Sequence, residues 1–458
     1  MARVLGVLVA ALVAWGSVAQ ADEHGVLGFD RRWQQLENNP SCAVWNPNPQ
    51  PNESVTWSGA CANAMAQGRG TSALRVLIEG EWKKKSEFTG EMKDGKKHGR
   101  GFLVWANGNS YEGNFKDGKQ HGHGVLVWGP DSKWAGDRYE GDFKDGLQHG
   151  HGVYVTANGG GYEGDWRVGK RHGRGVAVWE SGDRYEGEFR DGKEHGYGAL
   201  VLVNGDRYEG DWINSKEHGR GVLVFANGER YDGDWREGRE HGHGAAVFAN
   251  GDRYDGDWRD GARTGRGVYV FANGARYEGQ FKDDKRHGRG VLVYANGDKY
   301  EGEFKDDTRH GRDAVVFVNG NRYDGDWKDG KARGRGVYVW PNGARYDGEF
   351  RDGEEHGHGV IVYANGARYD GDWKDGMQQG RGVYVAANGD RYDGEYRNDK
   401  EHGRGIVVFS SGSRYDGDWK DGKRHGRGVF LWASGNRYEG DFRDGMQHGK
   451  GVFFVSER

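Results

Sequence analysis

A 23-residue period dominates this sequence. The segment RYDGDWKDGKRHGRGVFLWASGN, residues 414–436, directly follows a nearly identical segment, and tyrosine, tryptophan, glycine and histidine recur at the same offsets along most of the chain. Such a period is typical of repeat arrays, which grow by adding copies instead of dividing into separate cores. We therefore expect one array, although 458 residues alone would suggest about three domains.

Alignment on the aromatic residue of the Tyr-x-Gly segment gives 16 copies. Each step is 23 residues, except that five additional residues lie between Tyr111 and Tyr139. Upstream, Trp57 opens a degenerate copy, and residues 22–87 are predicted to form a cap that covers the exposed edge of the array. The repeat array is predicted over residues 88–458. The copies begin at Phe88, Tyr111, Tyr139, Tyr162, Tyr185, Tyr208, Tyr231, Tyr254, Tyr277, Tyr300, Tyr323, Tyr346, Tyr369, Tyr392, Tyr415 and Tyr438.

Each copy predicts two antiparallel strands. The pattern RYEGDW alternates aromatic and glycine positions with acidic positions, as a half-buried strand does, and HGRGVLVF forms the second strand. The KDGK segment predicts a turn with a left-handed glycine. That glycine is replaced by Ser215 and by aspartate, which tolerates this conformation, at Asp284, Asp307 and Asp399. The Asn-Gly dipeptide of ANGD or ANGA predicts a two-residue hairpin to the next copy.

The predicted fold class is therefore all-β, an elongated single-layer antiparallel meander of about 16 hairpins. A strand spacing of about 4.8 Å would make this array roughly 150 Å long.

The recurring pattern YEGDWKDGKRHGRGVLVWANG resembles the MORN repeat over residues 88–458. The resemblance implies a single-layered sheet of hairpins with Tyr, Trp and Leu beside glycines in a groove. It also implies binding, scaffolding or membrane-associated assembly rather than chemistry. Four copies depart from the pattern, because Thr264, Arg333 and Gln379 replace the usual histidine and Asp313 replaces a glycine.

The N-terminus predicts export. Arg3 precedes an apolar run that ends at Val18, and Ala19-Gln20-Ala21 is a small-x-small cleavage pattern, so residues 1–21 are predicted to be a signal peptide. A retained anchor is the alternative, although about 15 apolar residues are short for a bilayer span. We expect a periplasmic or extracellular protein, with a membrane-peripheral position left open, and no transmembrane segment after cleavage.

The only two cysteines, Cys42 and Cys61, both lie in the predicted cap. In an exported protein they predict a disulfide, and the rival metal pair lacks further ligands nearby. The 66 basic and 70 acidic side chains are mixed along the chain. We therefore expect no nucleic-acid partner and weak attraction to anionic lipid.

One face of the sheet is predicted to carry the aromatic rings, over Gly417, Gly426 and Gly428 in the copy from Tyr415. These rings are either the core of a single sheet or a track on which sugar rings stack. The aromatic groove is represented by Tyr231, Trp235, Phe225, Tyr415, Trp419 and Trp432.

The opposite face is predicted to carry valines on either side of the second-strand aromatic position. This pattern reflects either β-propensity among solubilising charges or an apolar stripe that pairs two copies of the chain or binds a protein partner. The candidate interaction stripe consists of Val222, Val224, Val268, Val270, Val291, Val293, Val337 and Val339.

Histidines in the His-Gly column, and those that follow two residues later as at His123, could bind a metal. The alternative is that they close the loop by hydrogen bonding and pair with nearby acids, and their replacement in three copies favours this role. The other charges are expected to form surface pairs. No catalytic constellation or nucleotide loop is visible, so we expect a non-enzymatic binding scaffold without cofactor or metal, or else a glycan- or lipid-binding module.

Overall fold

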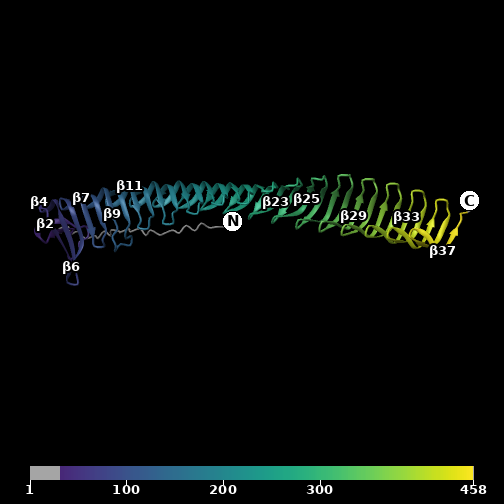
Figure 1. The fold of residues 1–458 in the computed structure, drawn as a ribbon, viewed down its shortest axis with the longest axis horizontal. Coiled ribbons are helices and arrows are strands. Elements are labelled where there is room, and N and C mark those ends of the chain that lie inside the picture. The colour runs from purple at the N-terminus through teal and green to yellow at the C-terminus, as the bar shows by residue number, and fades with distance from the viewer. Residues whose placement is uncertain (1–30, 457–458) are drawn as a thin grey trace, which may run out of the picture. The chain divides into compact units, whose positions relative to one another are not determined.

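The computed structural model describes residues 31–456, in which all regular secondary structure is β-strand. The chain divides into two units between His241 and Gly242. Within each unit, the strands of the repeats lie side by side in chain order (Figure 1). The all-β class and the antiparallel meander of tandem hairpins are thus confirmed. The predicted signal peptide, residues 1–21, lies outside the described residues.

The N-terminal strands are organised around one long strand. This strand pairs antiparallel with three others and, through Met65 and Ala43, in parallel with a fourth. The sixth strand runs without interruption past residue 87 into the first repeat. The strands are β1 (Trp33–Leu36), β2 (Asn39–Trp45), β3 (Glu53–Trp57), β4 (Ala60–Ala62), the long β5 (Met65–Ile78) and β6 (Glu81–Lys93).

A disulfide joins Cys42 to Cys61 with their Cα atoms 6.0 Å apart, as predicted. The ring of Trp57 lies against Gly59 and Gly70, since a Cβ atom on either glycine would come within 2.6 Å of it. The tyrosines of the later repeats lie on paired glycines in the same way, so Trp57 occupies the position of the repeat tyrosine.

The repeats of the first unit contain β7 (Lys96–Trp105), β8 (Ser110–Lys116), β9 (Lys119–Val127), β10 (Arg138–Lys144), β11 (Leu147–Val155), β12 (Gly161–Arg167), β13 (Lys170–Val178), β14 (Arg184–Arg190), β15 (Lys193–Val201), β16 (Arg207–Ile213), β17 (Lys216–Val224) and β18 (Arg230–Arg236). The point of division lies in β19 (Arg239–Val247).

The second unit contains β20 (Arg253–Arg259), β21 (Ala262–Val270), β22 (Arg276–Lys282), β23 (Lys285–Val293), β24 (Lys299–Lys305), β25 (Thr308–Val316), β26 (Arg322–Lys328), β27 (Lys331–Val339), β28 (Arg345–Arg351), β29 (Glu354–Val362), β30 (Arg368–Lys374), β31 (Met377–Val385), β32 (Arg391–Arg397), β33 (Lys400–Val408), β34 (Arg414–Lys420), β35 (Lys423–Leu431), β36 (Arg437–Arg443) and β37 (Met446–Phe454).

The turn inside each repeat has two residues, both left-handed. In β16–β17 these are Asn214 and Ser215, with φ angles of 52° and 66°. Positive φ at both central residues is typical of the type I′ hairpin, whose twist matches that of the flanking strands. The predicted left-handed position is therefore confirmed, including at the replaced glycines Asp284, Asp307 and Asp399.

The Asn-Gly loop between repeats is longer than the predicted two-residue hairpin, and that prediction is wrong. Val224 pairs with Arg230, and the Phe225 N–H then donates to the Glu229 carbonyl at 2.8 Å. The three residues 226–228 close the loop, with a left-handed Gly228 at φ 87°. A turn followed by a left-handed glycine spans this length, whereas a two-residue turn does not.

A bulge interrupts the second strand of each repeat. In β16–β17, Gly210 pairs with Gly221 but the next residue, Asp211, pairs with His218, which leaves two residues of β17 without partners in β16. The Asp211 carboxylate accepts a hydrogen bond from the backbone N–H of Arg220 at 3.0 Å. The acid before the tryptophan therefore stabilises the bulge, a role beyond the surface pairing that we expected.

The core of the sheet is a layer of edge-packed aromatic rings. The ring of Tyr208 lies 5.1 Å from that of Trp212 in its own strand and 5.2 Å from Trp235 in the next repeat, both edge-on. Its hydroxyl donates to the Asp211 carbonyl at 3.0 Å. A Cβ atom on Gly221 would come within 2.2 Å of the Tyr208 hydroxyl oxygen, so this approach requires glycine.

Candidate interaction surfaces

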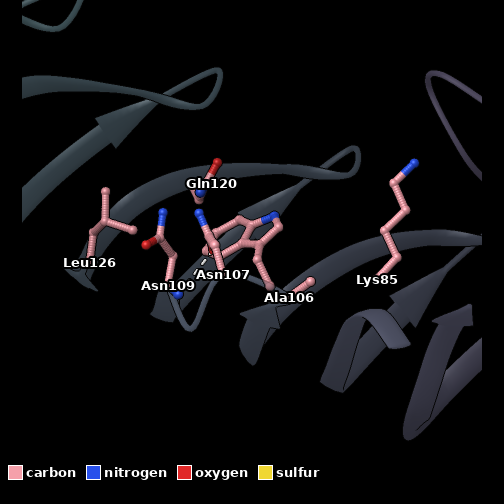
Figure 2. Close-up of a pocket in the computed structure, with 7 residues that line it drawn as sticks. Lys85, Ala106, Asn107, Asn109, Gln120 and Leu126 are labelled. Atoms are coloured by element: carbon pink, nitrogen blue, oxygen red, sulfur yellow. Dashed lines mark hydrogen bonds between the residues drawn. The ribbon is translucent and has the colours of Figure 1, made fainter. Parts of the chain in front are cut away.

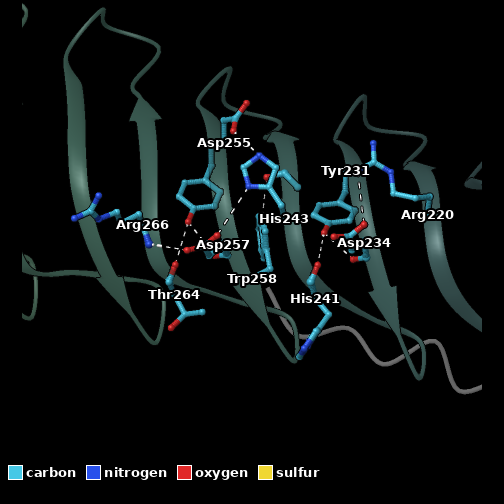
Figure 3. Close-up of polar contacts among 12 residues, drawn as sticks. Arg220, Tyr231, Asp234, His241, His243, Asp255, Asp257, Trp258, Thr264 and Arg266 are labelled. Carbon is cyan, nitrogen blue, oxygen red and sulfur yellow. Dashed lines mark hydrogen bonds and ion pairs between the residues drawn. The ribbon is translucent and has the colours of Figure 1, made fainter.

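The ring face of the sheet holds the predicted aromatic groove residues at different depths. Tyr231, Trp235 and Tyr415 are buried, whereas Trp419 is half-buried. Figure 3 shows the Tyr231 hydroxyl directed at backbone carbonyls, those of Asp234 at 2.9 Å and His241 at 3.4 Å. The tyrosine column is therefore the core of the sheet. Burial raises the pKa of Tyr415 to about 12.

Gly426 does not lie beneath the rings as predicted. A Cβ atom on Gly426 would come within 2.5 Å of the Asp418 carboxylate, on the acidic face, because the bulge turns this residue over. Gly417 and Gly428 do lie against the ring of Tyr415.

Loop aromatics form a second, more accessible row on the ring face. Phe225 and Trp432, both half-buried, stand at the ends of second strands where the long loop begins. The Trp432 ring packs 4.6 Å from Phe430 and 5.3 Å from Phe453. These rings retain accessible surface that the tyrosine column lacks.

The opposite face, which we call the outer face, carries the valines. Val224 pairs with Arg207 on one side and Arg230 on the other. Arg230 forms an ion pair of 2.7 Å with Asp232, two residues along its own strand. Val224 thus lies between two arginine stems whose guanidinium groups are paired with acidic neighbours. Exposed pairs of this kind contribute at most about 1 kcal/mol each.

Exposure along the predicted stripe is uneven. Val224 is 36% exposed, while Val222, Val268, Val270, Val291, Val293, Val337 and Val339 are half-buried. The most exposed members of the column close the second strand, and most of them were not predicted, although their place at the strand end could have identified them. They are Val155, Val178 and Val201 in the first unit, and Val247, Val316, Val362 and Val408 in the second.

The MORN-repeat model matches this chain in tandem copies from residue 88 to residue 456, which cover most of it. The chain belongs to the MORN-repeat family. The matched segments are residues 88–110, 111–133, 139–161, 162–184, 185–207, 208–230, 231–253, 254–276, 277–299, 300–312, 323–345, 346–368, 369–391, 392–414, 415–437 and 438–456.

Other similarities are weak. No curated protein matches the chain. The TCP domain of SAS-4 from Drosophila melanogaster, solved with a proline-rich motif of Ana2, is 14% identical, covers 34% of this chain and 85% of its own, and has a TM-score of 0.23. An inactive virginiamycin B lyase from Staphylococcus aureus, solved with quinupristin, is 8% identical, with 65% and 95% coverage and a TM-score of 0.12. Neither supports a statement about this MORN-repeat protein.

In some MORN repeats the first histidine contacts the turn of the next repeat. The Asp375 N–H donates to His356 Nδ1 at 3.4 Å, and the Asp375 carboxylate lies 3.6 Å from the same nitrogen. Gln379 replaces this histidine one repeat later, and its Oε1 accepts from the Asn398 N–H at 3.2 Å. His356, His402 and Gln379 thus accept a hydrogen bond from the next turn. Among the described residues, the Nδ1 atoms of five other histidines of the column are buried without a hydrogen-bond partner: His121, His172, His195, His218 and His287.

The second histidine lies on the outer face beside acids of the following strand. Figure 3 shows His243 between Asp255 and Asp257, with ring nitrogens 3.2 Å and 4.0 Å from their carboxylates. The Asp257 carboxylate also accepts from the Arg266 N–H at 2.9 Å. Within residues 31–456, no group of three or more His, Cys, Asp or Glu side chains is placed to hold a metal ion.

The position before the first histidine carries a cation in several MORN repeats. In the best-formed case the Arg309 Cζ lies 4.0 Å from the Trp327 ring centroid and 5.5 Å from that of Tyr300. Its Nη2 donates to the Gly330 carbonyl in the next turn at 2.8 Å. Two rings and one carbonyl thus form a cation seat. The arginines at this position are Arg171, Arg263, Arg286, Arg309 and Arg424.

Other repeats place glutamate at the same position. Glu194 pairs with Phe189 and Glu217 with Trp212, so both side chains lie on the ring face. Glu194 is only 8% exposed, and burial raises the pKa of Glu217, with the Glu240 carboxylate adding to the rise. This column was not predicted from the sequence, because its residue type changes between copies.

A cleft lies on the ring face near the N-terminal strands. It has a volume of about 460 Å³, and Figure 2 shows amide side chains from Asn107, Asn109 and Gln120 beside Leu126. Trp105 and Lys85 also line it. The cleft therefore combines an aromatic ring with several hydrogen-bonding groups. In the part of the chain that the structure describes, no helix is long and apolar enough to cross a membrane.

Proposed function

We propose that this MORN-repeat protein is a non-enzymatic exported scaffold that binds a protein partner, or a second copy of itself, through its outer face. The observation that carries this proposal is the exposed apolar side chain at the end of second strands, repeated from copy to copy. Val178, Val201 and Val224 show it in three successive repeats. Repetition favours binding, because identical surfaces at fixed spacing give multivalent attachment.

The surroundings of these valines suit a protein interface. Val224 lies between Arg207 and Arg230, whose aliphatic stems extend the apolar surface while their guanidinium groups remain paired with acids. An apolar centre with a charged rim is the usual composition of such interfaces. We therefore expect the partner to present a row of apolar side chains flanked by acidic and basic side chains.

In-cell photo-crosslinking tests this proposal. A photoreactive residue at Val224 reports on the outer face, and one at its neighbour Phe225 reports on the ring face. We expect discrete protein adducts, or adducts between two copies, from Val224 alone. Adducts from Phe225 alone, changing when glycan or lipid is extracted, would refute the proposal and assign binding to the ring face.

A matched pair of substitutions separates interface loss from general charge effects. With the photoreactive residue kept at position 224, Val178→Lys with Val201→Lys should abolish its adducts, because two ammonium groups would need burial in the interface. Ala226→Lys adds the same group at an exposed loop position nearby and should leave them unchanged. Equal loss from both would contradict the assignment to the valines.

Export is part of the proposal and has its own test. Cleavage after Ala21 predicts that the mature protein begins at Asp22. Intact-mass measurement on protein recovered from the periplasm or medium should give this N-terminus. Protein that retains residues 1–21 and sediments with membranes would indicate a membrane anchor instead.

The second candidate function is glycan binding in the cleft beside Trp105. An aromatic ring near the amides of Asn107, Asn109 and Gln120 is suited to a sugar, which stacks on rings and hydrogen-bonds to amides. Trp105→Ala should then abolish retention on an envelope glycan column, while Trp432→Ala, a half-buried ring outside the cleft, should not.

A further inference from the structure

Three successive repeats carry Glu194, Glu217 and Glu240 at the position where the arginine repeats hold a cation on the ring face. In the arginine repeats the guanidinium lies over a tryptophan or phenylalanine of the next repeat and, at Arg309, donates to the carbonyl of the turn glycine Gly330. At Glu194 the corresponding residues are Trp212 and Ser215, and at Glu217 they are Trp235 and Gly238, at the same sequence offsets. Both positions therefore keep the ring and the turn carbonyl of the next repeat, but neither carries the guanidinium that would bind them.

The carboxylates that replace the guanidinium groups at these two positions have no cationic partner in the part of the chain that the structure describes. Glu194 is 8% exposed and Glu217 is half-buried, and within residues 31–456 neither carboxylate forms an ion pair with a lysine, arginine or histidine. The Glu217 Oε2 lies at the next turn, 3.2 Å from where a Cβ atom on Gly238 would be. The carboxylate and the turn carbonyl are therefore two acceptors near one seat, and a partly buried carboxylate is stabilised when a cation pairs with it.

The glutamate does not itself occupy the position of the guanidinium. Its carboxyl carbon is two bonds closer to Cα than the guanidinium carbon of arginine, so it stops short of the point where Arg309 lies over Trp327. An incoming guanidinium at that point would meet the ring face, the turn carbonyl and the carboxylate together. Such charge-assisted, often bidentate contacts are the strong hydrogen bonds of proteins.

The spacing of the two seats selects a particular ligand geometry. Successive repeats are two strand spacings apart, about 9.6 Å. A polyproline II segment rises about 9.3 Å per turn of three residues, so arginines at every third position all project from one side at this spacing. In a β-strand, residues three apart point in opposite directions.

We propose that the seats at Glu194 and Glu217 bind two arginine side chains, three residues apart, from an extended polyproline II segment of a partner protein. This ring-face site is separate from the outer-face valines and does not depend on the function proposed for them. The segment would run across the strands, along the array.

Fluorescence anisotropy with the full chain tests the proposal. The probe is a labelled peptide with arginine at every third position and Pro-Ala between, and the control peptide has the same composition with contiguous arginines. We expect the spaced peptide to bind, and Glu194→Gln with Glu217→Gln to weaken its binding at least about tenfold. Glutamine occupies this column naturally in other repeats, as at Gln378, so the variant should fold.

The chain provides a matched control pair. Glu355 and Glu401 occupy the same column, and burial raises the pKa of both, but Gln378 lies between them. Their separation, about 19 Å, is too long for arginines three residues apart. Glu355→Gln with Glu401→Gln should therefore leave binding of the spaced peptide unchanged.

Glu217→Arg provides an independent check, since it should fill one seat with the chain's own guanidinium and remove binding while the fold is kept. Three results would overturn the proposal: equal binding of the contiguous peptide, equal loss from the two glutamine pairs, or undiminished binding by Glu217→Arg. Each would show general attraction to acidic groups instead of two seats at a fixed spacing.

Discussion

Replacement of Gly221 by alanine tests whether ring-on-glycine contact holds the single sheet together. The new methyl group would lie 2.2 Å from the Tyr208 hydroxyl oxygen and 2.5 Å from its Cζ atom. Normal contact between such atoms is about 3.5–4.0 Å. Because Tyr208 is buried beneath the next repeat, either its ring must leave its place or the strands must separate.

The cost follows from what Tyr208 would lose. Its hydrogen bond to the Asp211 carbonyl contributes about 1 kcal/mol, and its edge-on contacts with Trp212 and Trp235 contribute about 0.5–1.5 kcal/mol each. We therefore expect Gly221→Ala to lower the free energy of unfolding of this region by about 2–4 kcal/mol. Separation of the strands instead would cost a similar amount.

Urea unfolding followed by tryptophan fluorescence, with hydrogen exchange at the amides of β16–β18, measures this change locally, as a repeat array requires. The decisive control is the same substitution in a Tyr208→Ala background. There it should be neutral or slightly stabilising, because alanine suits a strand better than glycine does. An equal cost in both backgrounds would show no coupling and would refute the role of the ring.

Three further predictions concern stability. His356→Ala should cost about 1 kcal/mol in a urea melt by removing the acceptor for the Asp375 N–H, whereas His356→Gln should be nearly neutral. Burial raises the pKa of Tyr277 from 10.0 to about 12; its contribution is therefore complete below pH 10 and is lost as pH rises towards 12. Between pH 10 and pH 12 the free energy of unfolding should fall by about 1.4 kcal/mol per pH unit for each such tyrosine. Tyrosinate absorbance measures the ionisation. Reduction of the Cys42–Cys61 disulfide should lower the stability of the N-terminal strands by roughly 3 kcal/mol, measured by hydrogen exchange with and without reductant.

Local sequence patterns predicted the strands and one of the two turns of each repeat correctly. Alternation of ring and acid in segments such as Arg207–Ile213 identifies the strand and its buried face, because side chains alternate with a period of two. The left-handed turn at Ser215 was predictable, since few residue types tolerate positive φ. The Asn-Gly loop was not, because its length depends on which residues of neighbouring strands pair, here Val224 with Arg230.

The interaction surfaces were only partly predictable. The outer-face valines follow from alternation, but the exposure of Val224 depends on the arginine stems placed beside it by two neighbouring strands. The glutamate and arginine column escaped notice because a repeat consensus averages over residues that differ between copies. The role of this column depends on contacts with the rings and the turn of the next repeat, which only the structure shows.

The sequence by itself determined the period, the copy number, the fold class, the face that carries the tyrosine rings, and the family. These features rest on backbone preferences and side-chain alternation, which act within one copy. Only the tertiary structure decided the bulge that turns Gly426 over, the hydrogen bond of Asp211 to the Arg220 N–H, and the cation seat at Arg309. These features join groups that are distant in sequence, in different strands or successive repeats, and their geometry exists only once hydrogen-bonded pairing has fixed the register.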